Sequence, residues 1–224
     1  MFIRSEKIVL ENERMVGMKK LNVENPFFEF MGSIGDVMLV NILFLIFSIP
    51  IVTIGASYTA MYRTFGDLRE GKTVFRSFFT AWKAALGRTV PAWIFLLLAG
   101  GILVFDITFL VRAGSNGIWA LVGMVTGCLL LLWSMVFCYL FPVVAGSEAA
   151  AQMRAKEMVS RSLYLAVRNL PYTLVMVVLN SIPAVCMILG DFYVGMIVPI
   201  YVIVGFGATA YLNRLLLDRC SDLG

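Results

Sequence analysis

Long apolar runs with almost no charged residues constrain this chain more than any other feature. Of the 224 residues, 60% are hydrophobic and only 14% are charged, and the mean hydropathy is +0.89. About 20 consecutive apolar residues are enough to cross the hydrocarbon core of a bilayer. We therefore predict an all-α fold, a polytopic membrane helix bundle with about five transmembrane helices in one domain (33–215). The predicted spans are residues 34–54, 90–111, 118–144, 171–189 and 192–212.

The segments outside this domain are short. Residues 1–32 carry five basic and five acidic side chains and no long apolar run, so we predict a surface tail. Met18 offers an alternative start, which would make residues 1–17 an extension. Residues 216–224 form the predicted C-terminal tail.

The residue types that most enzymes and metal sites need are missing or scattered. The chain has no histidine, and its four cysteines form no CxxC spacing. We find no paired carboxylates within a span and no glycine-rich phosphate loop. We therefore expect no catalytic, metal-binding or cofactor-binding residues and no enzyme activity. We also expect no nucleic-acid partner, because the basic residues cluster between spans, where they indicate membrane topology.

Polar and helix-breaking residues mark two of the predicted spans. In the first span, Asn41 and Ser48 are seven residues apart and share a helix face, and the run then reaches Pro50, Thr53 and Gly55. This break is either a simple helix end or a hinge that lines a substrate path, as in transporters with interrupted helices.

The fourth span repeats this combination with Asn180 and Pro183. If the protein is a transporter, Asn41 and Asn180 should line a common cavity. Asp106 lies inside the second span, near its outer end. A structural role, solvated at the interface or paired with Arg112, is favoured there over a functional one.

Two basic segments separate the spans, at residues 56–88 and 147–170. Each carries cations spaced by seven residues, which places them on one helix face, and the two sets are 85 residues apart. We predict two basic amphipathic helices, within an internal duplication of span, basic helix and span. They lie either at the membrane interface or over the end of the bundle. The cations are Arg69, Arg76 and Lys83, and then Arg154, Arg161 and Arg168.

The charge distribution also predicts an orientation. If both basic segments and the C-terminus share one side, that side carries 12 Lys and Arg and the other side carries six. The positive-inside rule then places the basic loops and the C-terminus in the cytoplasm. The basic helices would bind anionic lipid headgroups or the acidic surface of a partner.

Several short strings resemble the YesL family of bacterial membrane proteins (domain of unknown function 624). The likeness is best over residues 25–99 and continues, more weakly, to about residue 215. The strings are NPFF at 25–28, Asn41, SIPIVTIGAS at 48–57, Thr59-Ala60 and FRSFF at 75–79. The resemblance implies the cell membrane of a bacterium, genes beside carbohydrate uptake systems, sensors and glycoside hydrolases, and no established activity.

Two functions remain open at this point. The first is a non-enzymatic accessory protein of carbohydrate uptake or sensing machinery, with sugar ABC-permease or sensor-kinase subunits as partners. The alternative is a small stand-alone transporter or channel, which would act as a homo-oligomer because five spans make a thin pathway.

Overall fold

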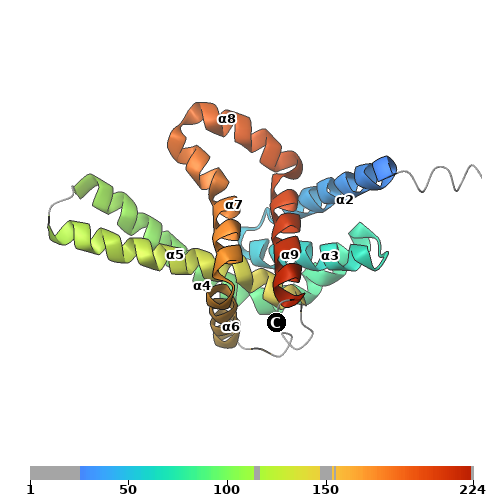
Figure 1. The fold of residues 1–224 in the computed structure, drawn as a ribbon, viewed down its shortest axis with the longest axis horizontal. Coiled ribbons are helices and arrows are strands. Elements are labelled where there is room, and N and C mark those ends of the chain that lie inside the picture. Colours follow the sequence, from blue (N-terminus) through green and yellow to red (C-terminus); the bar gives the residue numbers. More distant parts are fainter. Residues whose placement is uncertain (1–25, 114–116, 147–152, 154, 223–224) are drawn as a thin grey trace, which may run out of the picture.

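The computed structural model describes residues 26–113, 117–146, 153 and 155–222, and every regular element in this part is a helix (Figure 1). Most of the predicted N-terminal tail, including Met18, lies outside it, while residues 26–32 already belong to the first described helix. In chain order the elements are α2 (Pro26–Phe47), η1 (Ile51–Thr53), α3 (Ile54–Arg69), α4 (Val74–Ala113), α5 (Ile118–Gly146), α6 (Ala155–Arg168), α7 (Leu170–Leu189), α8 (Asp191–Ile200), the π-helical η3 (Tyr201–Gly205) and α9 (Phe206–Asp222).

Four of the described helices are long and apolar enough to cross a membrane, which confirms the predicted helical membrane bundle. They cover Val74–Leu110, Ile118–Gly146, Leu170–Leu189 and Asp191–Arg219. The helix of the predicted first span is shorter, with an apolar stretch at Met31–Phe47. It ends before Ser48 because Pro50 has no N–H to donate and disfavours a helical conformation at the residue before it.

The first basic segment does not form a helix of its own, which differs from the expectation. It is the beginning of α4, a continuous helix of 40 residues that is about 60 Å long at 1.5 Å per residue. Pro91, at the predicted start of the second span, lies inside α4 and does not end the helix. The second basic segment does form a separate helix, α6, because the chain leaves helical geometry at Asn169 and Pro171 opens α7.

The order of helices therefore differs between the two proposed repeats. Helix α6 precedes α7 as a separate element, whereas the matching basic segment is fused to the second span. The 85-residue duplication stays a prediction from sequence. The predicted C-terminal tail also differs, because α9 remains helical through Asp222.

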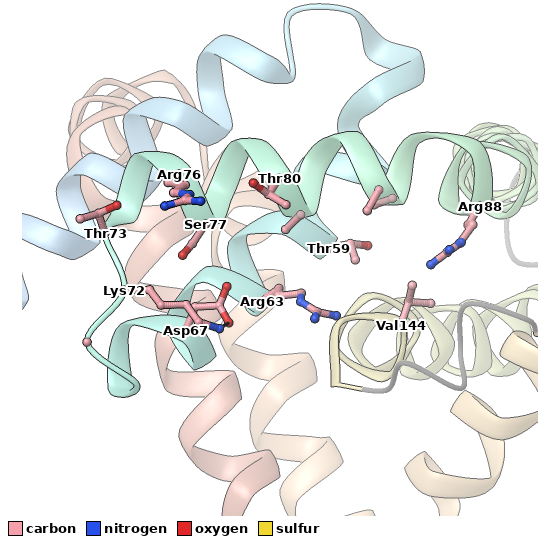
Figure 2. A pocket seen from close by; sticks show the side chains of 14 residues that line it. Thr59, Arg63, Asp67, Lys72, Thr73, Arg76, Ser77, Thr80, Arg88 and Val144 are labelled. Atoms are coloured by element: carbon pink, nitrogen blue, oxygen red, sulfur yellow. Dashed lines mark hydrogen bonds and ion pairs between the residues drawn. The ribbon is translucent and has the colours of Figure 1, made fainter.

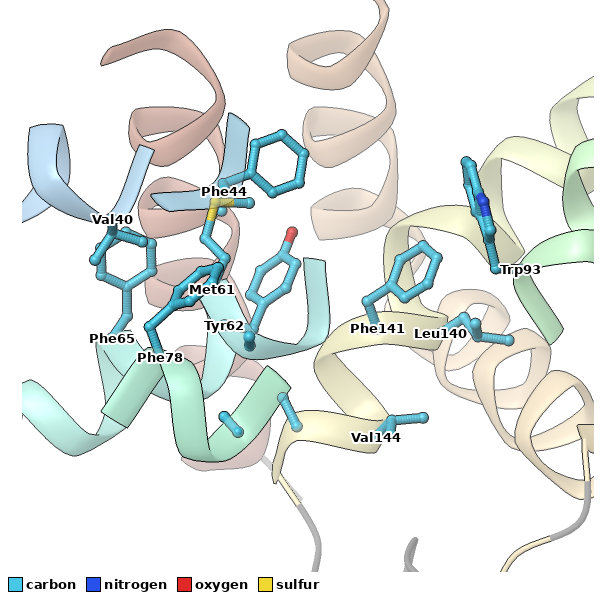
Figure 3. Close-up of a cluster of buried hydrophobic side chains, with 14 of the residues drawn as sticks. Val40, Phe44, Met61, Tyr62, Phe65, Phe78, Trp93, Leu140, Phe141 and Val144 are labelled. Atoms are coloured by element: carbon cyan, nitrogen blue, oxygen red, sulfur yellow. The ribbon is translucent and has the colours of Figure 1, made fainter. Parts of the chain in front are cut away.

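Helix α3 lies at the centre of the fold although it is much less apolar than the membrane helices. Ala56, Ala60 and Met61 are fully buried, and Phe65 is nearly so. Figure 3 shows Met61, Tyr62 and Phe65 of α3 among side chains of α2, α4 and α5. A short amphipathic helix thus joins the membrane helices into one core.

Two helical hairpins diverge from this core (Figure 1). One is made by α4 and α5, and the other by α7 with α8, η3 and α9. Their distal parts expose large apolar side chains, such as Phe105 at 70%, Ile188 at 84% and Phe192 at 74%. Large exposed apolar surfaces of this kind mark membrane contact, so these hairpins present lipid-facing side chains.

Candidate functional site

A polar cleft of about 900 Å³ lies between α3 and α4, and we call it the cationic cleft. Four cationic side chains line it, against one carboxylate. Hydroxyl groups and small side chains make up most of the remainder. The lining residues are Arg63, Lys72, Arg76 and Arg88, then Asp67, then Thr59, Thr73, Ser77 and Thr80, and finally Gly71, Ala81, Ala84, Ala85 and Val144.

The local sequence explains how the cleft forms. Helix α3 ends at Arg69, and Gly71, with a φ of 76°, reverses the chain so that α4 returns alongside α3. Glycine adopts this left-handed conformation without steric cost. Arg76, Ala84 and Arg88 then fall at multiples of four residues, on one face of α4. Small side chains on this face leave room between the two helices.

Figure 2 shows how the charged groups are arranged. Ser77 projects from α4 toward α3, and Arg63 rises from α3 into the space between the helices. Arg88 extends into the same space from the far end of the cleft, beside Val144 of α5. The cations therefore border the cleft from both helices and along its length.

The one carboxylate of the cleft is already paired. Lys72 Nζ lies 3.0 Å from Asp67 Oδ1 and 2.8 Å from Glu70 Oε2. Hydrogen bonds with Glu70 and then Asp67 raise the pKa of Lys72, so its ammonium group stays charged. Arg76 and Arg88 form no ion pair with any residue that the structure describes. The cleft thus has an excess of positive charge.

Ser77 adds a polar group that the fold leaves without a partner. Its side chain is only 6% exposed, and it lines the cleft. Its hydroxyl forms no hydrogen bond with any described residue, whereas buried hydroxyls elsewhere, such as those of Thr64 and Thr89, donate to a carbonyl one turn earlier. The Ser77 oxygen itself stays accessible from the cleft, so this hydroxyl is available to a ligand.

The first predicted basic face does not form as one surface. Arg69 ends α3, and its guanidinium forms an ion pair with Asp218 of α9. Arg76 lines the cleft, whereas Lys83 is exposed outside it. The seven-residue spacing failed as a guide here because the turn at Gly71 places Arg69 on another helix.

The second predicted basic face lies on α6. Arg161 and Arg168 are exposed there, and Arg154 lies outside the described residues. Met158 and Ser162 form the buried face of this helix, which packs against α5. The structure therefore places Arg161 and Arg168 on the surface of α6, and they do not line the cationic cleft.

The predicted hinge after the first span is a closely packed corner. Thr53 Oγ1 donates to the carbonyl of Phe47 at 2.7 Å and to that of Pro50 at 2.8 Å, which ties the helix end to η1. The indole Nε1 of Trp93 donates to the carbonyl of Ile51 at 2.7 Å. These bonds satisfy carbonyls that the break leaves without helical partners.

Close packing continues on both sides of this corner. A Cβ added at Gly55 would lie 2.6 Å from Cβ of Trp93, so the residue must be glycine for α3 and α4 to approach. Ser48 Oγ is buried without a described partner. Neither residue lines either of the two cavities discussed here. The geometry favours a structural helix end over a substrate-lining hinge.

Asn41 is fully buried and binds the irregular part of the last span. Its Nδ2 donates to the carbonyls of Val202 at 2.7 Å and Tyr201 at 3.3 Å, and its Oδ1 accepts from the N–H of Gly207 at 2.8 Å. The π-helical η3 breaks the regular α-helical bonding pattern at this level. Asn41 therefore acts as an interhelical clamp on η3.

Asn180 and Pro183 line a second cavity of about 360 Å³, whose mainly apolar and aromatic walls come from α3, α4, α5, α7, η3 and α9. Asn180 Nδ2 donates to the carbonyl of Met176 at 2.7 Å and contacts Sγ of Cys138 at 3.6 Å. Asn41 does not line this cavity. This cavity is therefore lined by one of the two amides and not by both.

Asp106 is half-buried within α4, and no ion pair joins it to Arg112 or to another residue of the described segments. No group of three His, Cys, Asp or Glu side chains in the described part of the chain is placed to hold a metal ion.

Sequence reasoning missed several residues of the cleft, namely Arg63, Lys72, Ser77 and Arg88. The four-residue spacing from Arg76 to Arg88 could have identified the α4 side. The contribution of Arg63 depends on α3, whose low hydropathy gave no sign of a central helix.

The comparisons with known proteins identify one family. A model of the family described as "Protein of unknown function, DUF624" matches residues 37–107. This is the YesL-type family, so the predicted resemblance is confirmed over that segment. The segment includes every lining residue of the cationic cleft except Val144. No curated protein and no solved structure matches the chain.

Proposed function

We propose that this YesL-type chain is a non-enzymatic accessory protein of the bacterial cell membrane, associated with carbohydrate uptake or sensing machinery. In this proposal the cationic cleft binds an anionic group presented at the cytoplasmic face. The association with carbohydrate systems rests on the family resemblance, and the mode of action rests on the cleft.

The composition of the cleft carries the proposal. Arginine, lysine and hydroxyl groups are hydrogen-bond donors suited to holding an anion. Asp67 is the one carboxylate in the lining, and Lys72 occupies it at 3.0 Å. No lining residue is therefore a free general base beside an activated nucleophile. Such a site supports binding in preference to catalysis.

The contacts around the cleft support a cytoplasmic position. Arg69, at the end of α3, pairs with Asp218 in the last helix, and Arg214 Nη1 donates to the carbonyl of Tyr62 at 2.8 Å. The end of α3 and the C-terminal helix thus belong to the same end of the molecule. That end carries the cations that the positive-inside rule assigns to the cytoplasm.

The test is co-purification from native membranes in mild detergent, followed by mass spectrometry. The wild-type chain is compared with an Arg76→Glu, Arg88→Glu double variant, and with Lys83→Glu as a matched charge reversal outside the cleft. We expect permease or sensor-kinase subunits to be recovered with the wild-type chain and with Lys83→Glu, and lost with the double variant. Recovery of the chain alone, at normal expression, would refute the accessory function.

A stand-alone transporter remains the second candidate, and the cavity beside Asn180 favours it. This cavity of about 360 Å³ lies between the two hairpins. A transporter of this size would act as a homo-oligomer. Reconstituted wild-type chain would then take up a labelled sugar into liposomes, and Asn180→Ala would abolish uptake without loss of expression. Absence of uptake by the wild-type chain would exclude this candidate.

A further inference from the structure

We propose that the cationic cleft is a binding site for a phosphate ester, supplied either by a lipid headgroup or by a soluble phosphorylated metabolite. This inference rests on the proposed function, because it specifies the anionic group that the cleft binds. It also explains why hydroxyl groups and a helix end border the cleft together with the cations.

The cleft lies at the N-terminal end of α4, one of the longest helices in the protein. Thr73 and Arg76 both line it, and the N–H of Ser77 makes the first bond of the helix, to the carbonyl of Thr73 at 3.1 Å. The three preceding amides, from Val74 to Arg76, have no acceptor within the helix. Such a helix end carries a partial positive charge and favours phosphate groups.

Ser77 provides an independent observation at the same place. It is 94% buried by its 6% exposure, it projects toward α3 in Figure 2, and its hydroxyl has no hydrogen-bond partner in the described structure. A diffuse basic surface that merely attracts lipid would not need an unpaired hydroxyl on a buried residue of the cleft wall. A ligand oxygen in the cleft would satisfy it.

The directions of the donors favour phosphate over carboxylate. Donors reach the N-terminal part of the cleft from the side chains of Arg76 and Ser77 and from the first turn of α4. Arg88 lies about 18 Å further along the same helix, where it adds positive charge to the far end of the cleft. A phosphate monoester, as in glucose 6-phosphate or phosphatidic acid, has three terminal oxygens in a tetrahedral arrangement and a charge between −1 and −2 near neutral pH. It can accept from several directions at once, whereas a planar carboxylate has two oxygens.

The size of the cleft fits a substituted phosphate better than the free ion. Its volume of about 900 Å³ is at the upper end of ordinary small-molecule sites, about 300–1,000 Å³. Ala81, Ala84 and Ala85 line the remaining wall and provide an apolar surface for the organic part of the ligand.

Binding to the full chain in nanodiscs tests the proposal. In phosphatidylcholine nanodiscs, inorganic phosphate, glucose 6-phosphate, glucose and glutarate are titrated by calorimetry at constant ionic strength. In a second arm, nanodiscs containing phosphatidylglycerol or phosphatidic acid are examined by native mass spectrometry for retained lipid. The variants are Arg76→Gln, Arg88→Gln and Ser77→Ala, with Lys83→Gln as the matched control on the same helix.

We expect glucose 6-phosphate or the phosphate-bearing lipid to bind, and glucose and glutarate to bind at least about tenfold more weakly. Arg76→Gln should weaken phosphate binding about tenfold, the effect of one lost charge-assisted hydrogen bond. Arg88→Gln, about 18 Å further along α4, should weaken it less, through the loss of charge in the cleft. Ser77→Ala should weaken it about threefold, and Lys83→Gln by less than about twofold. Binding in the soluble arm assigns the site to a metabolite, and retention in the lipid arm assigns it to a headgroup.

Three results would overturn the inference. They are equal affinity for glutarate and glucose 6-phosphate, equal losses for Lys83→Gln and Arg76→Gln, and no phosphate-dependent binding in either arm by a folded wild-type chain. If partner subunits still co-purify in a manner that depends on Arg76 and Arg88, the proposed accessory function stands and only the phosphate inference fails. If phosphate binds but no partner is recovered, the phosphate inference stands and the proposed accessory function fails.

Discussion

If Asn41 clamps η3, its removal should destabilise the protein much more than removal of Asn180, the other amide within a predicted span. In Asn41→Ala, the buried N–H of Gly207 and the part-buried carbonyls of Tyr201 and Val202 lose their side-chain partner. Interhelical hydrogen bonds in membranes average about 0.6 kcal/mol each, so the three contacts together amount to about 2 kcal/mol. An unpaired buried polar group in proteins costs about 1–3 kcal/mol. Together the two contributions give an expected loss of about 3–5 kcal/mol in unfolding free energy.

The assay is reversible unfolding of the purified protein by sodium dodecyl sulfate in mixed micelles, followed by tryptophan fluorescence. Asn180→Ala is the matched control, since Asn180 donates chiefly to Met176 within its own helix and adjoins a cavity. We expect a loss below about 1 kcal/mol there. Hydrogen exchange should also accelerate over residues 201–207 in Asn41→Ala alone. Equal losses for the two variants, or unchanged exchange, would refute the clamp.

Three further predictions concern the packing of Gly207, the hydrogen bond from Trp93 to Ile51, and the pH dependence of phosphate binding. Gly207→Ala should cost about 1–3 kcal/mol in the same unfolding assay, because the added Cβ would lie 2.7 Å from the carbonyl oxygen of Val37. Trp93→Phe should cost about 1 kcal/mol, because it removes the hydrogen bond to Ile51. Phosphate binding to the cleft should be constant from about pH 7.5 to 9.5 in calorimetric titrations and weaken below about pH 6, where the ligand takes up a proton.

The sign of the pH prediction follows from Lys72. The pKa of Lys72 is raised above its ordinary value of 10.5. Its ammonium group therefore stays charged below pH 10.5 and loses its charge only as the pH rises through the raised pKa. A decline in phosphate binding between about pH 7.5 and 9.5 would contradict the assignment of these cations to the cleft.

Matched substitutions control the two packing predictions. Gly127 has no atom within 4 Å of an added Cβ, so Gly127→Ala should cause no loss of stability. Trp119 is 44% exposed, so Trp119→Phe should have little effect. If Gly207→Ala or Trp93→Phe behaves like its control, the corresponding contact does not stabilise the fold.

Hydropathy alone determined which segments form the membrane helices. The predicted spans at 90–111, 118–144 and 171–189 all lie within long apolar helices, because about 20 apolar residues can satisfy their backbone only as a helix in hydrocarbon. Pro50 likewise indicated the end of the first span. These are local properties, so they can be read without knowing what each helix contacts.

Tertiary structure alone decided how these helices are joined and where charge collects. Low hydropathy concealed α3, yet its buried face is the centre of the core. Asn41 and Asn180 looked equivalent in sequence, but one clamps η3 and the other adjoins a cavity. The cationic cleft depends on the return of α4 along α3 after Gly71. Such contacts form between side chains that are distant in sequence. The pattern of residues along the chain does not show which helix faces will pack together.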